Sequence, residues 1–219
     1  MRSLYDQELR DIHRDSIQIN NTAFESFQDA MEVVRRGDFT RIDRVQEQDR
    51  LIRVSRVNLN ERVLRMIATQ HPVAVDLRKL FYLIHTADEM TRISYQAVAI
   101  CQAILDTQYG KVILLEDLYR MSERVALMFE KMHSATRGDV EPMVETVIKS
   151  DDEVDVLYEQ IIRECLARRE GEQDRGRDVM TAYSIAKYIE HAGDHIVNWG
   201  RWWLFFNKPY EEDNPPILV

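Results

Sequence analysis

Two pairs of acidic residues stand where helical periodicity places them beside apolar faces. Asp151 and Asp155 are four residues apart, and so are Glu190 and Asp194. At 100° per residue, Asp151 falls inside the apolar stripe of its segment and Asp155 falls on the margin of that stripe. Glu190 and Asp194 repeat this arrangement in the last long segment. A carboxylate that faces a core needs a cation, a metal ion or access to solvent.

If the two margins face each other, four carboxylates converge on one patch. Such hard oxygen ligands suit Mg²⁺, Mn²⁺, Ca²⁺ or iron. The alternative is that the acids are solvated or paired with Arg163, Lys187 or Arg201, because acids four residues apart are common on helix surfaces. His191 and His195 are also four residues apart, but they fall on the side away from the stripe and are expected to face solvent.

Other catalytic patterns are missing from the sequence. A di-iron helical bundle needs two Glu-x-x-His pairs on separate helices, and only Glu130 with His133 has that spacing. No Ser/His/Asp arrangement, P-loop or glycine-rich phosphate cradle is present, so the chain is not expected to be an enzyme. A metal-dependent enzyme of the di-iron class remains the alternative. Cys101 and Cys165 form no CxxC pair, which favours reduced thiols in a cytosolic protein.

The elements that must position these acids are long helices. With 7 Gly and 5 Pro in 219 residues, the chain lacks the turn residues of an all-β protein. Breaks near residues 37, 71, 109, 138, 171–176 and 207 leave six segments with apolar residues three and four apart. Pro72 is expected at the first position of a helix and Pro142 in a first turn. Short connections make neighbouring helices antiparallel, which predicts a bundle.

An internal duplication divides these six segments into two sets of three. The tripeptide Arg-Gly-Asp at residues 36–38 recurs at 137–139, Asp49 corresponds to Asp151, and residues 91–95 align with 190–194. The predicted fold is therefore all-α, with two tandem three-helix bundles. We expect the first bundle over residues 1–109, the second over 110–208, and a flexible tail over 209–219.

The charge and hydropathy of the chain argue against several classes of partner. With 38 Asp and Glu against 29 Lys and Arg, the net charge is −9, so no nucleic acid partner is expected. No stretch approaches the roughly 20 apolar residues of a membrane span. The first residues contain acids and no apolar block, which is unlike a signal peptide and favours a cytoplasmic location.

Three motifs resemble those of the PhoU family. Residues 70–78 are similar to its Q-x-P-x-A-x-D-L-R signature, residues 188–195 to its L-E-R-I-G-D-H motif, and residues 151–155 to its D-x-x-V-D motif. The resemblance covers nearly all of residues 4–208. It implies two three-helix bundles and a non-enzymatic regulator of phosphate uptake and phosphate-starvation signalling. The implied partners are the ATPase of a phosphate ABC transporter and a phosphate-sensing histidine kinase.

The resemblance also implies a metal site, because some family members bind iron, zinc, manganese or magnesium through E/D-x-x-x-D motifs. In the second copy Glu190 and Asp194 match this motif, and His191 replaces the usual arginine. In the first copy Thr91 and Tyr95 stand at the acidic positions. A metal is therefore expected in the second bundle and not in the first.

Candidate partner-binding residues are Trp202, Phe205 and Arg78. Adjacent aromatic residues point in different directions on a helix, so some of those near the end of the last segment must leave the core. They form either a docking patch, for another protein or for a second copy in a homodimer, or core packing. Arg78 either binds a partner or pairs across the bundle. A structural dimerisation module without a regulatory role is a further alternative.

Overall fold

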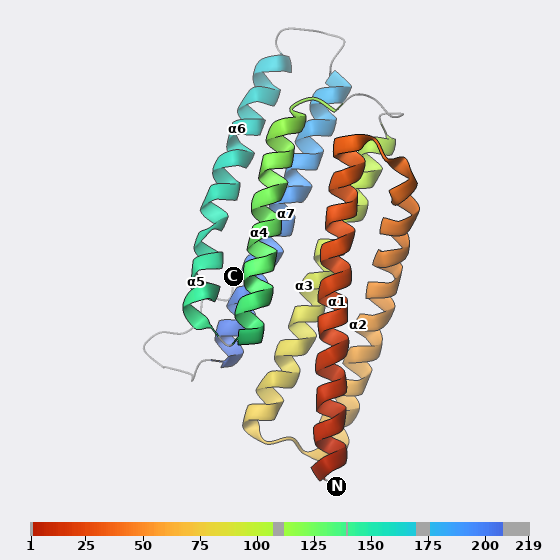
Figure 1. The fold of residues 1–219 in the computed structure, drawn as a ribbon, viewed down its shortest axis with the longest axis vertical. Coiled ribbons are helices and arrows are strands. Elements are labelled where there is room, and N and C mark those ends of the chain that lie inside the picture. The colour runs from red at the N-terminus through yellow and green to blue at the C-terminus, as the bar shows by residue number, and fades with distance from the viewer. Residues whose placement is uncertain (1, 107–111, 139, 170–175, 208–219) are drawn as a thin grey trace.

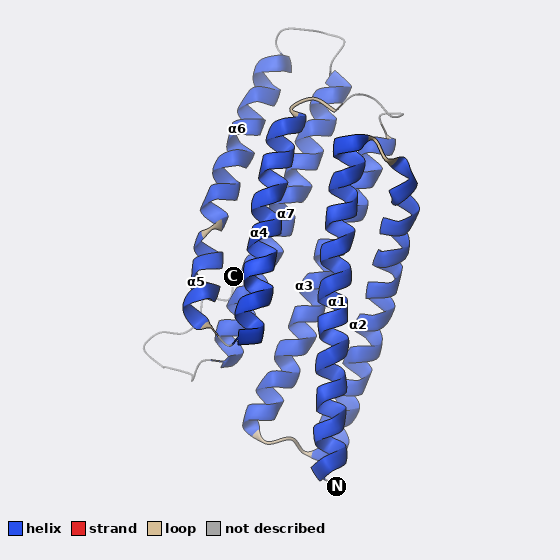
Figure 2. Cartoon of the chain, viewed as in Figure 1, coloured by secondary structure: helices blue, strands red, loops and turns tan. Residues whose placement is uncertain are grey.

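The computed structural model of the chain describes residues 2–106, 112–138, 140–169 and 176–207. The described residues form helices joined by short loops, with no strand among them (Figure 2). In chain order the helices are α1 (Arg2–Arg36), the 3₁₀ turn η1 (Phe39–Arg41), α2 (Ile42–Gln70), α3 (Ala74–Leu105), α4 (Leu115–Gly138), α5 (Glu141–Lys149), α6 (Asp151–Arg169) and α7 (Gly176–Asn207). The predicted tail, residues 209–219, lies outside the described residues.

The helices form two three-helix bundles side by side, as predicted. Helices α1, α2 and α3 pack on one another, and α4, the α5–α6 pair and α7 form the second group (Figure 1). Helices α3 and α7, the last of each group, also pack along each other and join the two bundles. Because α7 has neighbours on two sides, two of its faces are buried. This double contact decides where several functional side chains lie.

Local chemistry explains where the helices of the first bundle begin and end. Gly37 has φ +66°, and its N–H bonds to the carbonyl of Val33 at 3.0 Å, which ends α1 in a left-handed cap. His71 ends α2 in the left-handed conformation with φ 47°, and Pro72 directly after it cannot continue the helix. The prediction for Pro72 was wrong by two residues, because Val73 is the N-cap and α3 begins at Ala74.

The expected fifth helix is broken at Ser150. Its N–H and its hydroxyl share the carbonyls of Thr146 and Val147, at 2.9–3.1 Å, so the turn tightens at this residue. Pro142 lies in the first turn of α5, as predicted. Since α6 starts directly after Ser150, Asp151 stands at its first position, where the helix dipole favours a negative charge.

Candidate metal centre

Asp151 lies half-buried between α6 and α7. A Cβ atom on Gly193 would lie 3.2 Å from Oδ1 of Asp151, so the missing side chain makes room for the carboxylate against α7. Burial raises the pKa of Asp151 to about 7, and the negative charges of Asp155, Asp194 and Glu190 add to the effect. The seam between α6 and α7 thus concentrates negative charge around a carboxylate that is partly removed from water.

Glu190, His191 and Asp194 form a compact group on α7. Each offers one ligand atom, and these atoms all lie within 4.8 Å of one another. Nδ1 of His191 is 2.8 Å from Oε2 of Glu190 and 3.7 Å from Oδ2 of Asp194. The Glu190 side chain is 21% exposed and that of Asp194 is 51% exposed, so the group opens to solvent on one side. Burial, and then the charge of Asp194, raises the pKa of Glu190.

Asp155 completes the set of four predicted acids from the margin of α6. Burial is the first cause of its raised pKa, and the charge of Asp194 across the seam is the second. Asp151 and Glu190 likewise feel acids of the opposite helix. All four predicted acids thus lie along one seam between α6 and α7, but only Glu190 and Asp194, together with His191, bring ligand atoms within 4.8 Å of one another. This seam comprises Asp151, Asp155, Glu190 and Asp194, and is called the acidic seam below.

The donor set of the acidic seam fits a hard or borderline divalent cation. Carboxylate oxygens suit Mg²⁺ and Mn²⁺, and the imidazole nitrogen of His191 extends the range to zinc and iron. The raised pKa values point the same way, because a cation would offset the mutual repulsion that disfavours ionisation. Glu130 and His133 lie apart from this seam, and among the described residues no further acid, His or Cys completes a metal-binding group with them.

The prediction that both histidines face solvent was wrong. His191 joins the candidate ligands of the acidic seam. Nδ1 of His195 lies 2.9 Å from Oε2 of Glu89 on α3, and the two side chains are only 15% and 10% exposed. The prediction assumed that α7 packs only against helices of its own bundle. In the structure α3 of the other bundle covers the face of α7 opposite its apolar stripe. The sequence did contain a clue to the role of His191, because it stands within one helical turn of two other possible metal ligands, Glu190 and Asp194.

The equivalent place in the first bundle is closed. Asp49 is buried, and it pairs with Arg53 at 2.9 Å and accepts a hydrogen bond from the Ser94 hydroxyl at 3.0 Å. The Thr91 hydroxyl donates to a backbone carbonyl of its own helix at 2.8 Å, and the Tyr95 side chain is exposed. In the first copy one arginine and one hydroxyl therefore already hold the buried acid.

Arg78 caps the end of α7. Its Nε donates to the carbonyl of Phe206 at 2.9 Å, and its NH2 donates to that of Phe205 at 2.5 Å. A cation at this place satisfies carbonyls of the last turn and complements the helix dipole. Arg78 therefore links α3 to α7 across the two bundles, which is the pairing that the sequence left open.

The aromatic residues at the end of α7 divide between core and surface. Trp199 and Trp203 are buried, and Nε1 of Trp199 donates to the hydroxyl of Tyr82 at 2.8 Å. Trp202 is half-buried and stacks on His85 of α3, with ring centroids 3.7 Å apart. Phe205 lies edge-on to Trp202 at 6.2 Å. Much of this cluster thus packs between α3 and α7, and only part of its surface is left for a partner.

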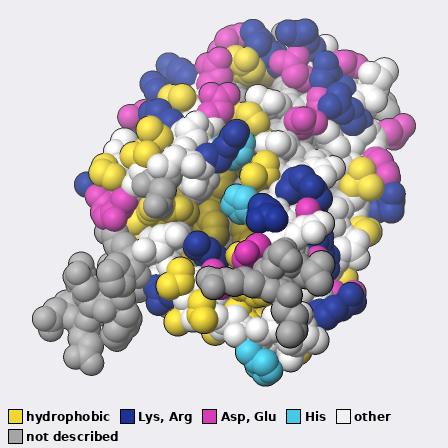
Figure 3. Space-filling model, turned by 60° about the horizontal axis from the view of Figure 1, so that its bottom comes forward, with side chains coloured by type: hydrophobic (Ala, Val, Ile, Leu, Met, Phe, Trp, Pro, Cys, Tyr) yellow, Lys and Arg dark blue, Asp and Glu magenta, His cyan; other side chains and the backbone are white. Residues whose placement is uncertain are grey.

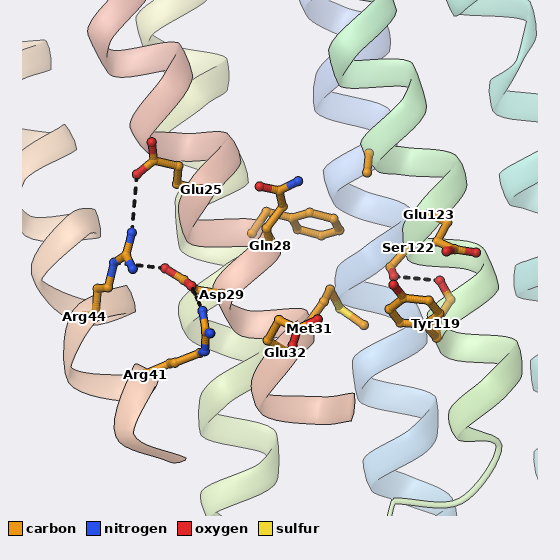
Figure 4. A pocket seen from close by; sticks show the side chains of 12 residues that line it. Glu25, Gln28, Asp29, Met31, Glu32, Arg41, Arg44, Tyr119, Ser122 and Glu123 are labelled. Carbon is orange, nitrogen blue, oxygen red and sulfur yellow. Dashed lines mark hydrogen bonds and ion pairs between the residues drawn. The ribbon is translucent and has the colours of Figure 1, made fainter. Parts of the chain in front are cut away.

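A polar groove of about 430 Å³ between α1, the start of α2 and α4 was not anticipated from the sequence. Asp29 lies at its centre and pairs with Arg41 at 2.5 Å and with Arg44 at 3.1 Å (Figure 4). Arg44 also reaches Glu25 at 3.5 Å. The acids of α1 and the arginines at the start of α2 neutralise one another and hold the two helices together. We therefore interpret this cluster as structural.

Comparison with known proteins agrees with the duplicated architecture. The PhoU domain family model matches residues 17–104 and again residues 118–203. The chain is 25% identical over 200 residues to a "Phosphate-specific transport system accessory protein PhoU homolog" of Clostridium acetobutylicum, covering 90% of this chain and 91% of that protein. It is 27% identical over 198 residues to the Escherichia coli K12 protein "Phosphate-specific transport system accessory protein PhoU", covering 89% and 81%.

Two solved structures share the fold. The crystal structure of PhoU from Pseudomonas aeruginosa superposes with a TM-score of 0.88 at 19% identity, over 93% of this chain and 98% of the other. The phosphate transport system regulatory protein PhoU from Streptococcus pneumoniae gives a TM-score of 0.82 at 16% identity, over 93% and 96%. With one match in each three-helix bundle, the chain belongs to the PhoU domain family.

Proposed function

We propose that this protein is a non-enzymatic regulator of phosphate uptake and of phosphate-starvation signalling. The observation that carries the proposal is the family match in both bundles, together with relatives named as accessory proteins of phosphate-specific transport. The protein acts in the cytoplasm through contacts with the ATPase of a phosphate ABC transporter and with a phosphate-sensing histidine kinase. Among the described residues, no helix combines the length and apolar character needed to cross a bilayer.

Deletion of the gene tests the regulatory role. In cells grown at high phosphate, loss of a negative regulator leaves the starvation response switched on, so alkaline phosphatase activity rises and a plasmid copy of the gene restores repression. Unchanged phosphatase and unchanged phosphate uptake would instead favour the alternative of a structural dimerisation module. Capture of the tagged protein from phosphate-replete cells, read by mass spectrometry, identifies whether the transporter ATPase or the kinase is bound.

We also propose that the acidic seam holds a divalent metal ion or iron, with Asp151, Asp155, Glu190 and Asp194 as the oxygen donors. Bound there, the ion neutralises the seam and links α6 to α7. The support is the placement of the four acids along one seam and the raised pKa values of Asp151, Asp155 and Glu190. His191 would orient Glu190, or replace one carboxylate as a nitrogen donor.

Elemental analysis of a double variant tests this site. Glu190→Ala with Asp194→Ala should remove tightly bound Mg, Mn, Zn or Fe while the helical circular dichroism stays unchanged. The matched control is Asp152→Ala with Glu153→Ala, which deletes two exposed acids of the first turn of α6. Equal metal content in wild type and the seam variant would refute the assignment, and equal loss in both variants would indicate non-specific binding to surface acids.

A further inference from the structure

A groove of about 620 Å³ opens where the two bundles meet, at the end of the molecule that holds the start of α1 and the end of α7. It is lined by α1 and α3 of the first bundle and by α4 and α7 of the second. Its apolar lining includes Leu9 and Ile17 of α1, Leu83 of α3 and Trp203 of α7. Figure 3 shows a hollow on this side of the molecule with an apolar floor, and with Lys, Arg and His side chains as well as Asp or Glu side chains around its edge.

The charged residues of this groove all have the same sign. Arg10 and Arg14 line it from α1 and Lys79 from α3, and His13 of α1 lies beside them with its neutral form favoured. None of the described residues that line the groove is acidic. Arg14 pairs with Asp11 at 2.9 Å, whereas Arg10 and Lys79 have no ion-pair partner among the described residues.

The electrostatic environment of His13 shows the influence of Lys79 across the groove. Burial lowers its pKa, and the positive charge of Lys79 across the groove lowers it further. Like charges brought together beside an apolar surface repel one another unless an anion lies between them. This is the reverse of the chain as a whole, whose net charge is −9. Cations that line one hollow of a chain with this net charge form a place where an anion can bind.

We propose that this groove binds a free amphipathic organic anion, with a carboxylate, sulfonate or phosphate head group on an apolar body. The head group lies between Arg10 and Lys79, and the apolar body lies along Ile17, Leu83 and Trp203. The volume falls within the range of about 300–1,000 Å³ that is usual for small-molecule sites. Because the lining comes from both bundles, the bound anion contacts α1 and α3 on one side and α4 and α7 on the other.

A small ligand fits the groove better than a membrane surface does. The apolar residues lie at the bottom of a concavity, where a flat bilayer does not reach, and the cations lie at its rim. The proposal is independent of the phosphate-regulatory function and of the acidic seam, which lies between α6 and α7. Its failure would leave both of those proposals untouched.

Isothermal titration of the full chain with dodecanoate, below its micelle concentration, tests the proposal. We expect saturable binding of one dodecanoate per chain. Neither acetate, which lacks the apolar body, nor dodecyltrimethylammonium, which reverses the charge, should bind comparably. Arg10→Glu with Lys79→Glu should weaken dodecanoate binding by at least about tenfold. Arg65→Glu, at an exposed position of α2 away from the groove, should change it by less than about twofold.

Ile17→Ser is a second variant that leaves every charge in place. It should weaken binding by about fivefold, because it shortens the apolar lining. Equal affinity of wild type and both groove variants would overturn the proposal, and so would equal affinity for the cationic amphiphile. Binding to vesicles of anionic phospholipid without binding of free dodecanoate would assign the patch to a membrane surface instead, and would also overturn it.

Discussion

The two bundles differ in how they accommodate a carboxylate that faces their last helix. In each, a carboxylate on the second helical segment faces the last helix of its bundle: Asp49 faces α3 and Asp151 faces α7. In the first bundle the acid is buried and balanced, because Arg53 pairs with it and Ser94 donates a hydrogen bond to it. In the second bundle Asp155 stands at the position of Arg53, and Gly193 at that of Ser94.

The remaining substitutions enlarge the contrast. Glu190 and Asp194 replace Thr91 and Tyr95, so together with Asp155 the second copy has acids at three positions where the first copy has a neutral or a basic group. The physical result is a pKa of about 7 for Asp151, caused by burial and by three neighbouring acids. A duplicated helix pair thus serves as a closed structural contact in one half and as an unbalanced anionic seam in the other. The difference lies in these side chains and in the break at Ser150, since α2 runs without interruption through the corresponding place in the first bundle.

Converting the second seam into a copy of the first should have the largest effect. Asp155→Arg places a cation where Arg53 stands in the first bundle, next to Asp151. Since one negative charge is lost and one positive charge gained, we expect affinity for Mn²⁺ to fall by at least about 100-fold. Titration calorimetry of the metal-free protein measures it.

The matched control is Asp152→Arg, which makes the same change of charge at an exposed neighbouring position of α6. It should lower affinity only slightly, because solvent and salt screen that site. Similar losses in the two variants would mean that overall charge, and not the geometry of the acidic seam, governs binding.

Neutralising the two equivalent aspartates should give opposite results for stability. Asp49→Asn weakens the charged contacts with Arg53 and Ser94, and should lower the free energy of unfolding by about 1–3 kcal/mol. Asp151→Asn removes a carboxylate that its neighbours repel, so in the metal-free protein at pH 8 it should leave stability unchanged or raise it. Urea unfolding followed by circular dichroism compares them, and a larger loss for Asp151→Asn would contradict our account of the second seam.

The same contrast predicts how stability depends on pH. The pKa of Asp151 is about 7 in the folded chain and near its ordinary value of 3.8 when unfolded, so the folded state holds more protons between these limits. Stability of the metal-free protein should therefore fall as pH rises from about 4 to about 7. Asp151→Asn should flatten this slope, whereas Asp49→Asn should retain it. Unfolding curves in the presence of EDTA at several pH values give the measurement.

Much of the fold could be predicted from the sequence because it depends on long-range regularity. Apolar spacing, scarce turn residues and the repeated tripeptide at 36–38 and 137–139 predicted two sets of three helices. The break at Ser150 was missed because it arises from local hydrogen bonds, in which the N–H and the hydroxyl of Ser150 share the carbonyls of Thr146 and Val147. That is a local competition to which helical periodicity is insensitive.

The sequence predicted the part of the candidate site that depends only on α6 and α7. The angles of Asp151 and Glu190 on their own helices were enough to bring the acids to one seam. His195 was misplaced because its environment comes from Glu89, on a helix of the other bundle. The packing of α3 against α7 cannot be inferred from the periodicity of either helix alone. The basic groove was missed for the same reason, as its lining comes from both bundles.

The smallest predicted effect comes from Gly193→Ser, which restores the side chain of Ser94 at the equivalent place. Its Cβ would lie 3.2 Å from Oδ1 of Asp151, close enough that the carboxylate must shift by a few tenths of an ångström. A neutral hydrogen bond contributes about 0.5–1.5 kcal/mol, so a hydroxyl that donates to ionised Asp151 should lower its pKa by about one unit or less. The midpoint of the pH dependence of stability in the metal-free protein should move down by the same amount.

Gly193→Ala has the same Cβ but no hydrogen-bond donor, and serves as the control. If both variants shift the midpoint equally, Gly193 matters only because it leaves room for the Asp151 carboxylate. The difference between the two bundles would then depend on Arg53 and Asp155 alone.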